Sequence, residues 1–153
     1  MQFQRVIGKL MQRGWRLTRS HTLGAQGIVI DGENRILLVR HGYRPGWHFP
    51  GGGVEKNETL EAALRRELLE ETGVEILGSP ELLGIFANFL IFPGDHVVVY
   101  VIRSWRQPRI PQANSEILEQ RFFDRADLPS DLAAGARRRL AEVFENKPRQ
   151  HNW

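Results

Sequence analysis

The sequence predicts a single α/β domain in which helices pack against a mixed β-sheet. The chain has 153 residues, 41% of them hydrophobic and 25% charged, so one core is expected to bury roughly two-thirds of the unfolded surface. Short β-like segments precede a helix, and further β-like segments precede a second helix. The chain contains no cysteine and no apolar run of about eighteen residues. These absences exclude a disulfide framework, a thiolate metal site and a cysteine nucleophile, and they argue against a helical membrane span.

Residues 1–20 are expected to form an amphipathic N-terminal helix. Apolar residues recur there at helical spacing between arginines and lysines, with no acidic residue: Phe3, Val6, Ile7, Leu10 and Met11. We expect this helix to pack on the core or to contact a second copy in a homodimer. A basic amphipathic start also fits a mitochondrial transit peptide, but a strand pattern begins soon afterwards, which favours a cytoplasmic protein.

The next segments read as strand, turn and strand. Residues 23–30 and 35–40 are β-like, and Asp31-Gly32-Glu33-Asn34 between them predicts a hairpin turn. Residues 41–56 read as a loop because they contain Pro45, Pro50 and the triplet Gly51-Gly52-Gly53.

The strongest helix prediction covers residues 59–72, which contain good helix formers, no glycine and no proline, and end at Gly73. Beyond it, residues 97–102 form a continuous apolar run that fits a strand covered on both faces. A last helix is predicted from a cap at Ser130 or Asp131 to about residue 146. The other predicted elements are β-like segments at 74–77, 81–92 and 116–124, a turn at 93–95 and a loop at 107–115.

Three carboxylates break the pattern of the helix at 59–72. Leu64 and Leu68 belong to its apolar stripe, and Glu67, Glu70 and Glu71 fall on or beside that stripe. Each like-charge pair costs about 0.2–0.5 kcal/mol even on an exposed helix, and the C-terminal end of the helix dipole disfavours anions. A divalent cation compensates these costs together, and all-oxygen ligands favour Mg²⁺ or Mn²⁺.

The loop before this helix supplies candidate substrate contacts. The backbone N–H and C=O groups of Gly51, Gly52 and Gly53 are free to approach phosphate or metal. Arg40 and Arg44 lie in the same stretch and could bind substrate phosphate or base, as could His48, the alternative being a solvated loop. Residues 137–139, three arginines on the last helix, are expected to form a solvated face, with a patch that binds a phosphate backbone as the minority alternative.

These residues spell a known signature. Gly52 is followed after five residues by Glu58, then after seven by Arg66-Glu67-Leu68, and then by Glu70-Glu71 and Gly73-Val74. This spacing matches the complete Nudix box at residues 52–74, and the chain resembles the Nudix hydrolase family, MutT-like, from about residue 22 to 145. The resemblance implies an α/β/α sandwich with a mixed β-sheet and hydrolysis of a nucleoside diphosphate linked to another group.

The resemblance also implies roles for individual residues. Glu67, Glu70 and Glu71 would be metal ligands together with the Gly52 carbonyl, and Arg66 and Glu58 would orient these acids. The general base would be Glu67 or, from a later segment, Glu116, which is also a candidate metal ligand.

Three functions remain open at this point. The leading hypothesis is a metal-dependent hydrolase of small nucleotides, because the markers of the ADP-ribose, dinucleoside polyphosphate, coenzyme A and NADH types are absent or do not fit. The second is an RNA 5′-end pyrophosphohydrolase, whose triphosphorylated substrate the arginine-rich composition would suit. The third is a Nudix-fold nucleotide-binding module without turnover, against which the complete set of acids argues.

Overall fold

A computed structural model describes residues 21–153 of the chain, so the helix expected at 1–20 lies outside the described residues. No helix within residues 21–153 has the length and apolar character needed to cross a membrane. The elements, in chain order, are β1 (Thr22–Val29), β2 (Ile36–His41), β3 (Trp47–His48), β4 (Gly51–Gly53), α2 (Leu60–Thr72), β5 (Glu75–Ile76), β6 (Glu81–Ala87), β7 (Asp95–Ile102), β8 (Trp105–Arg106), β9 (Ile117–Phe123), the 3₁₀ turn η1 (Arg125–Asp127) and α3 (Ala134–Phe144).

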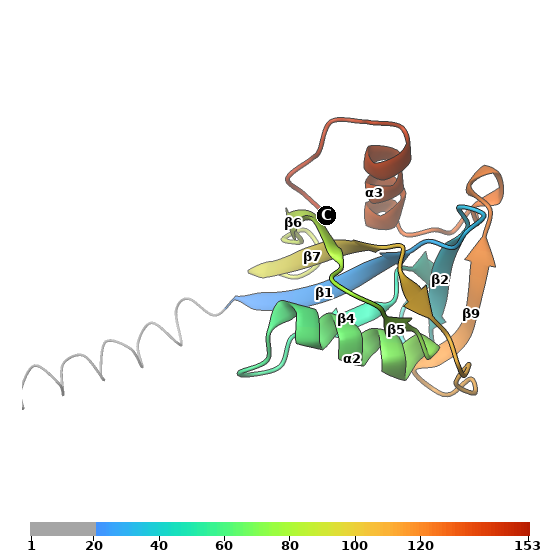
Figure 1. The fold of residues 1–153 in the computed structure, drawn as a ribbon. Helices are drawn as coiled ribbons and strands as arrows, with labels where there is room; N and C mark the ends of the chain where they lie inside the picture. The colour runs from blue at the N-terminus through green and yellow to red at the C-terminus, as the bar shows by residue number, and fades with distance from the viewer. Residues whose placement is uncertain (1–20) are drawn as a thin grey trace, which may run out of the picture.

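A four-stranded mixed sheet forms the centre of the molecule, in the order β4-β1-β7-β6 (Figure 1). Strand β1 runs parallel to β7 and antiparallel to β4, and β6 runs antiparallel to β7. The mixed sheet predicted from the sequence is therefore confirmed.

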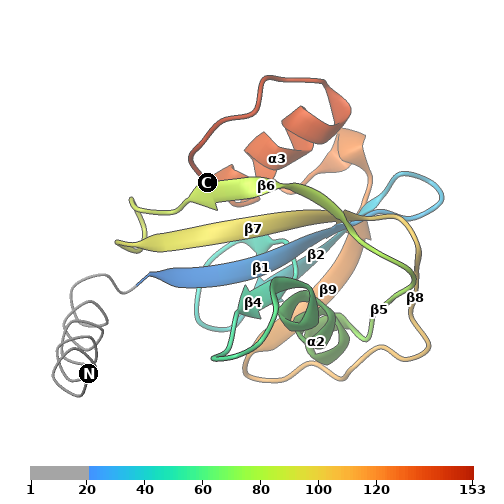
Figure 2. The ribbon, with the colours of Figure 1, turned by 60° about the vertical axis from the view of Figure 1, so that its left-hand side comes forward.

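The side chains of β7 alternate between two separate hydrophobic cores. Val97 and Val99 belong to the core that contains Leu140 of α3, whereas Val98 and Tyr100 belong to the core that contains Leu64 of α2. The two helices accordingly lie on opposite faces of the sheet (Figure 2). Both faces of β7 are covered, as its continuous apolar run predicts, and the α/β/α sandwich is confirmed.

The hairpin prediction at 23–40 is correct for the turn and wrong for the pairing. Beyond the single bridge between Ile30 and Ile36, β1 and β2 do not pair with each other. Instead, β2 pairs with β3 and β9 in a separate three-stranded antiparallel sheet. The chain crosses from one sheet to the other at this turn, because β1 pairs with β4 and β7 while β2 pairs with β3 and β9.

The predicted loop at 41–56 also contains two short strands, β3 and β4. The glycine triplet is β4, and it pairs with β1 through Gly24 and Gly53, Ala25 and Gly52, and Gln26 and Gly51. In the opposite sense, the predicted β segment at 81–92 is strand only as far as Ala87, and a turn follows. In that turn the side chain of Leu90 is completely exposed.

The two main helices differ in how the free backbone N–H groups at their N-termini are capped. The Thr59 side chain accepts a hydrogen bond from Ala62 N–H, and Gly73 closes α2 in the left-handed conformation, as the sequence predicts. Helix α3 begins later than predicted, at Ala134, and its N-cap Ala133 provides no side-chain acceptor. The expected cap at Ser130 or Asp131 is therefore wrong, and the helix ends at Phe144 rather than near residue 146.

Candidate functional site

The C-terminal half of α2 packs against β4, and this contact determines where the acids lie. Glu71 is buried on the sheet side of the helix, and its Oε2 accepts a hydrogen bond of 2.8 Å from the Gly51 N–H. Glu67, one turn earlier, is half-buried, whereas the side chain of Glu70 is 61% exposed. The helix thus presents its three acids at graded depth beside the glycine strand.

The electrostatics of this cluster disfavour negative charge. Burial raises the pKa of Glu71 to about 8, and the charges of Glu67 and Glu116 contribute to the rise, against the hydrogen bond from Gly51. Burial also raises the pKa of Glu67, against the hydrogen bond from Arg66. Repulsion among buried carboxylates is the condition that a bound cation relieves.

Arg66 joins the acids of the helix to the loop before it. Its Nε and Nη2 each donate to a different oxygen of Glu58, both at 2.9 Å, and its Nη1 donates to Glu67 at 2.7 Å. The same guanidinium lies 3.5 Å from Glu70 and donates to the Gly53 carbonyl at 3.1 Å. These hydrogen bonds hold the pKa of Glu58 down at about 2. Arg66 and Glu58 are therefore placed to orient Glu67.

The carboxylate of Glu67 lies directly against Gly52. A Cβ atom at position 52 would lie 2.6 Å from the Cδ and Oε1 atoms of Glu67, closer than real Cβ contacts occur. The absence of a side chain at Gly52 is what allows the acid and the strand backbone to meet. The two predicted ligands, Glu67 and Gly52, are thus adjacent.

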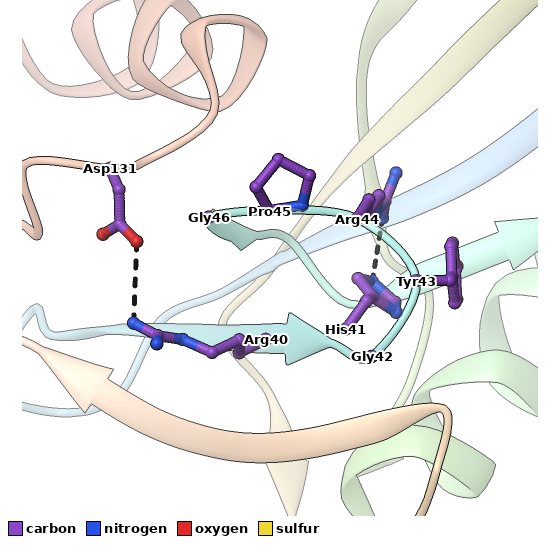
Figure 3. A pocket seen from close by; sticks show the side chains of 8 residues that line it. All are labelled: Arg40, His41, Gly42, Tyr43, Arg44, Pro45, Gly46 and Asp131. Atoms are coloured by element: carbon purple, nitrogen blue, oxygen red, sulfur yellow. Dashed lines mark hydrogen bonds and ion pairs between the residues drawn. The ribbon is translucent and has the colours of Figure 1, made fainter.

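His41 is a site residue that the sequence reasoning missed. It is buried at the end of β2, its Nε2 lies 2.8 Å from Arg44 Nη2, and its Nδ1 lies 3.9 Å from Glu71 Oε1 (Figure 3 shows the link to Arg44). Burial lowers its pKa to about 4, and the charge of Arg44 adds to this. At neutral pH the uncharged ring accepts the hydrogen bond from Arg44 and lies beside Glu71, and its Nδ1 has no hydrogen-bond partner among residues 21–153.

Two cavities adjoin the cluster and distinguish the two predicted substrate arginines. The larger, of about 780 Å³, is lined by Arg44, His48 and the backbone of β4. The smaller, of about 530 Å³, is lined by both Arg40 and Arg44. Arg40 points away toward Asp131, at 3.6 Å (Figure 3), and lies over the Trp47 ring. Of the two arginines, only Arg44 therefore lines both cavities, and the buried Nε atoms of both arginines have no hydrogen-bond partner among residues 21–153.

Glu116 lies just before β9 and is exposed. Its backbone carbonyl accepts from the Gly42 N–H at 2.9 Å, which holds this segment against the end of β2. Its charge contributes to the raised pKa values of Glu67 and Glu71, so the fold brings it toward the acids of α2.

The oxygen atoms of Glu67, Glu71 and Gly52 are of the kind that bind a hard divalent cation, although both acids accept hydrogen bonds in the structure. Carboxylate oxygens with raised pKa values and a backbone carbonyl at Gly52 are ligands that Mg²⁺ and Mn²⁺ accept. No three Asp, Glu or His side chains within 21–153 are grouped to hold one ion as they stand. Glu71 is bonded to Gly51 and Glu67 to Arg66, so a cation would have to compete with these partners.

The three arginines of α3 do not form the solvated face expected from the sequence. Only Arg137 is exposed. Arg139 is fully buried and donates to Glu142 at 2.6 Å, with its guanidinium 3.7 Å from the centre of the Phe86 ring. Arg138 lines the larger cavity. The sequence did not reveal this because the burial depends on the segment after the helix, which folds back over it.

Comparison with known proteins places this chain and its architecture in one family. A model of the NUDIX domain matches residues 20–145. An ADP-ribose pyrophosphatase from Methanocaldococcus jannaschii is 33% identical over 129 residues, which cover 82% of this chain and 75% of that protein. The chain therefore belongs to the Nudix hydrolase family, as the box at 52–74 predicts. Within the family its fold is MutT-like: a MutT Nudix hydrolase from Burkholderia pseudomallei superposes with a TM-score of 0.70 at 25% identity, over 82% of this chain and 99% of that one.

Other similarities are shorter. The Nudix hydrolase YvcI of Bacillus subtilis is 39% identical over 70 residues, which are 46% of this chain. That match covers 43% of the length of YvcI, so the chain spans less than half of this relative.

Proposed function

We propose that this chain is a divalent-metal-dependent pyrophosphohydrolase that cleaves nucleoside diphosphate derivatives. The observation that carries the proposal is the packing of Glu67 and Glu71 against the glycine strand β4, at the edge of a cavity lined by Arg44. Dense negative charge on a pyrophosphate needs cations on one side and a positioned water on the other. The family membership and the enzyme names of the relatives support the same reaction.

Each residue of the cluster has a defined task in this proposal. Glu67, Glu70, Glu71 and the Gly52 carbonyl would hold Mg²⁺ or Mn²⁺, which supplies charge neutralisation on the pyrophosphate and a more acidic bound water. Arg66, fixed by Glu58, orients Glu67. Arg44 donates to pyrophosphate oxygens from the cavity wall while His41 holds it in place.

The proton of the attacking water goes to Glu67 or to Glu116. Glu67 lies at the centre of the cluster, but its hydrogen bond to Arg66 occupies one of its oxygens. Glu116 is exposed and lies near enough to influence both buried acids. Glu116→Gln separates the two, because the loss of the base there would lower turnover more than metal affinity, whereas Glu67→Gln would also remove a proposed metal ligand.

A product-resolved hydrolysis panel tests the proposal. The wild-type chain is incubated with Mg²⁺ in parallel reactions, each of which contains one substrate class: ADP-ribose, nucleoside triphosphates, nucleotide sugars, dinucleoside polyphosphates or a 5′-triphosphorylated RNA. We expect cleavage of one class, loss of activity with EDTA and recovery on addition of Mg²⁺ or Mn²⁺. Cleavage undiminished by EDTA would refute the metal requirement. Nucleotide binding without any cleavage would turn the proposal into the binding-module alternative, and cleavage confined to the RNA would favour the RNA 5′-end alternative.

A further inference from the structure

The segment that follows α3 folds back onto the edge of the central sheet. The Ala87 N–H donates to the His151 carbonyl at 2.8 Å, and the Trp153 N–H donates to the Ala87 carbonyl at 2.9 Å. Asn152 thus forms a parallel bridge with Ala87 at the end of β6. This segment lies beyond residue 145, where the match to the family ends. The segment is attached at a sheet edge, and its Trp153 lines the larger cavity.

Buried charges of α3 hold this segment in place. Arg139 donates to the Asn152 carbonyl at 3.0 Å and to Glu142 at 2.6 Å, and Glu142 accepts from the Gln150 N–H at 2.9 Å. Arg138 donates to the Trp153 carbonyl. Arg139 and Glu142 are both buried, and each forms a hydrogen bond with the backbone of this segment besides their own ion pair. The position of Trp153 is therefore fixed by several contacts.

The indole of Trp153 lies over the first turn of α3. A Cβ atom at Gly135 would lie 2.5 Å from the ring, so only glycine allows this close approach. The centres of the Phe49 and Phe86 rings each lie 6.4 Å from the indole. The indole is half-buried, and it lines the cavity of about 780 Å³ that the backbone of Gly51–Gly53 also lines.

The walls of this cavity are of two kinds. The guanidinium of Arg44 is suited to phosphate, whereas Trp153, Ile91 and Phe92 offer apolar and aromatic surface. A volume of this size accommodates a ligand considerably larger than pyrophosphate. A nucleotide has both chemical characters in one molecule, with an anionic end and a flat aromatic end.

We propose that Trp153 is a specificity-determining residue that packs against the nucleobase of the substrate. The inference rests on the proposed function and deepens it, because it assigns the part of the substrate that the segment after α3 recognises. Stacking on an aromatic side chain tolerates different bases, since every base has a π-face. Trp153 thus increases the affinity for substrates that contain a nucleobase, and the acids of α2 serve the cleavage of the pyrophosphate.

Two variants test the contact from its two sides. Trp153→Leu removes the aromatic face, and Gly135→Ala keeps the indole but forces it from its seat on α3. We expect each to raise KM for the nucleotide substrate about tenfold with kcat changed less than twofold. Hydrolysis of inorganic tripolyphosphate, which has no base, should be unchanged. Trp105→Phe is the matched control, because Trp105 stacks on Phe122 and does not line the cavity.

A binding measurement without turnover completes the test. Addition of AMP or GMP to the wild-type chain should quench tryptophan fluorescence, and the quench should persist in Trp105→Phe and be lost in Trp153→Leu. The Kd of Trp153→Leu for the same nucleotide, measured by calorimetry, should be about tenfold higher than that of the wild type. Unchanged KM and Kd in both Trp153→Leu and Gly135→Ala, with thermal unfolding showing folded proteins, would overturn the inference. Equal weakening toward nucleotide and tripolyphosphate would also overturn it, because it would assign the segment a purely structural role. Wild-type protein that cleaves no member of the panel would instead refute the proposed function.

Discussion

Substitution of Gly52 by alanine should damage catalysis while the fold survives. The added Cβ would lie 2.6 Å from the Glu67 carboxylate, about 0.8 Å inside the 3.4 Å at which ordinary contacts begin. Glu67 must therefore move by a comparable distance, against its 2.7 Å hydrogen bond with Arg66. A misplacement of about 1 Å in an active site costs on the order of 10²-fold in rate. We expect kcat to fall about 10- to 100-fold in an assay of phosphate release with saturating Mg²⁺.

The neighbouring glycine provides a matched control. A Cβ atom at Gly53 meets no atom within 4 Å, and both residues belong to the same short strand. Gly53→Ala should therefore keep the wild-type rate. The free energy of unfolding, measured by urea titration, should change by no more than about 1 kcal/mol in either variant, because neither residue has a positive φ. Equal activity of Gly52→Ala and Gly53→Ala would refute the argument that the close approach of Gly52 positions Glu67.

Three further substitutions separate stability from chemistry. The pKa of Glu58 is about 2 in the folded chain against an ordinary 4.5, so its contribution to stability is present above pH 4.5 and is lost as the pH falls toward 2. Glu58→Gln should lower stability at neutral pH and flatten the pH dependence in that window, whereas an unchanged acid limb in chemical denaturation would contradict the pairing with Arg66. Leu64→Ala, in the core beneath α2, should cost about 2–5 kcal/mol in urea titration, and a loss below 1 kcal/mol would contradict its place in the core. Glu116→Gln should lower turnover more than it lowers Mg²⁺ affinity in calorimetry if Glu116 is the base, and a normal rate would assign that role to Glu67.

Helix α2 could be predicted closely because its determinants are local. The cap at Thr59, the apolar stripe through Leu64 and Leu68 and the left-handed Gly73 lie within one short segment. The position of Glu67, Glu70 and Glu71 on or beside the apolar stripe could be predicted for the same reason, because the helical period determines which residues share a face. The burial of Glu71 agrees with its predicted position on the apolar stripe.

Strand pairing and the outer parts of the site could not be predicted, because they depend on contacts distant in sequence. The partners of β1 are β4 and β7, and no local signal distinguishes them from the β2 strand across the turn. His41 reads as the first residue of a loop, and only the fold brings Glu71 beside it. Trp153 and Arg139 acquire their environments only when the final segment reaches the edge of β6.

The central claim is that the buried carboxylate of Glu71 holds the cation needed for pyrophosphate cleavage. Glu71→Gln tests it most directly, because glutamine keeps the shape of the side chain and its amide oxygen can still accept from the Gly51 N–H. The measurement is Mn²⁺ affinity together with turnover, beside Glu61→Gln as the control from the same helix, where Glu61 pairs with Arg65. We expect a folded Glu71→Gln variant with weakened Mn²⁺ binding and a rate lower by orders of magnitude, while Glu61→Gln retains both properties. Wild-type Mn²⁺ affinity and turnover in Glu71→Gln would show that the Glu71 carboxylate does not hold the cation.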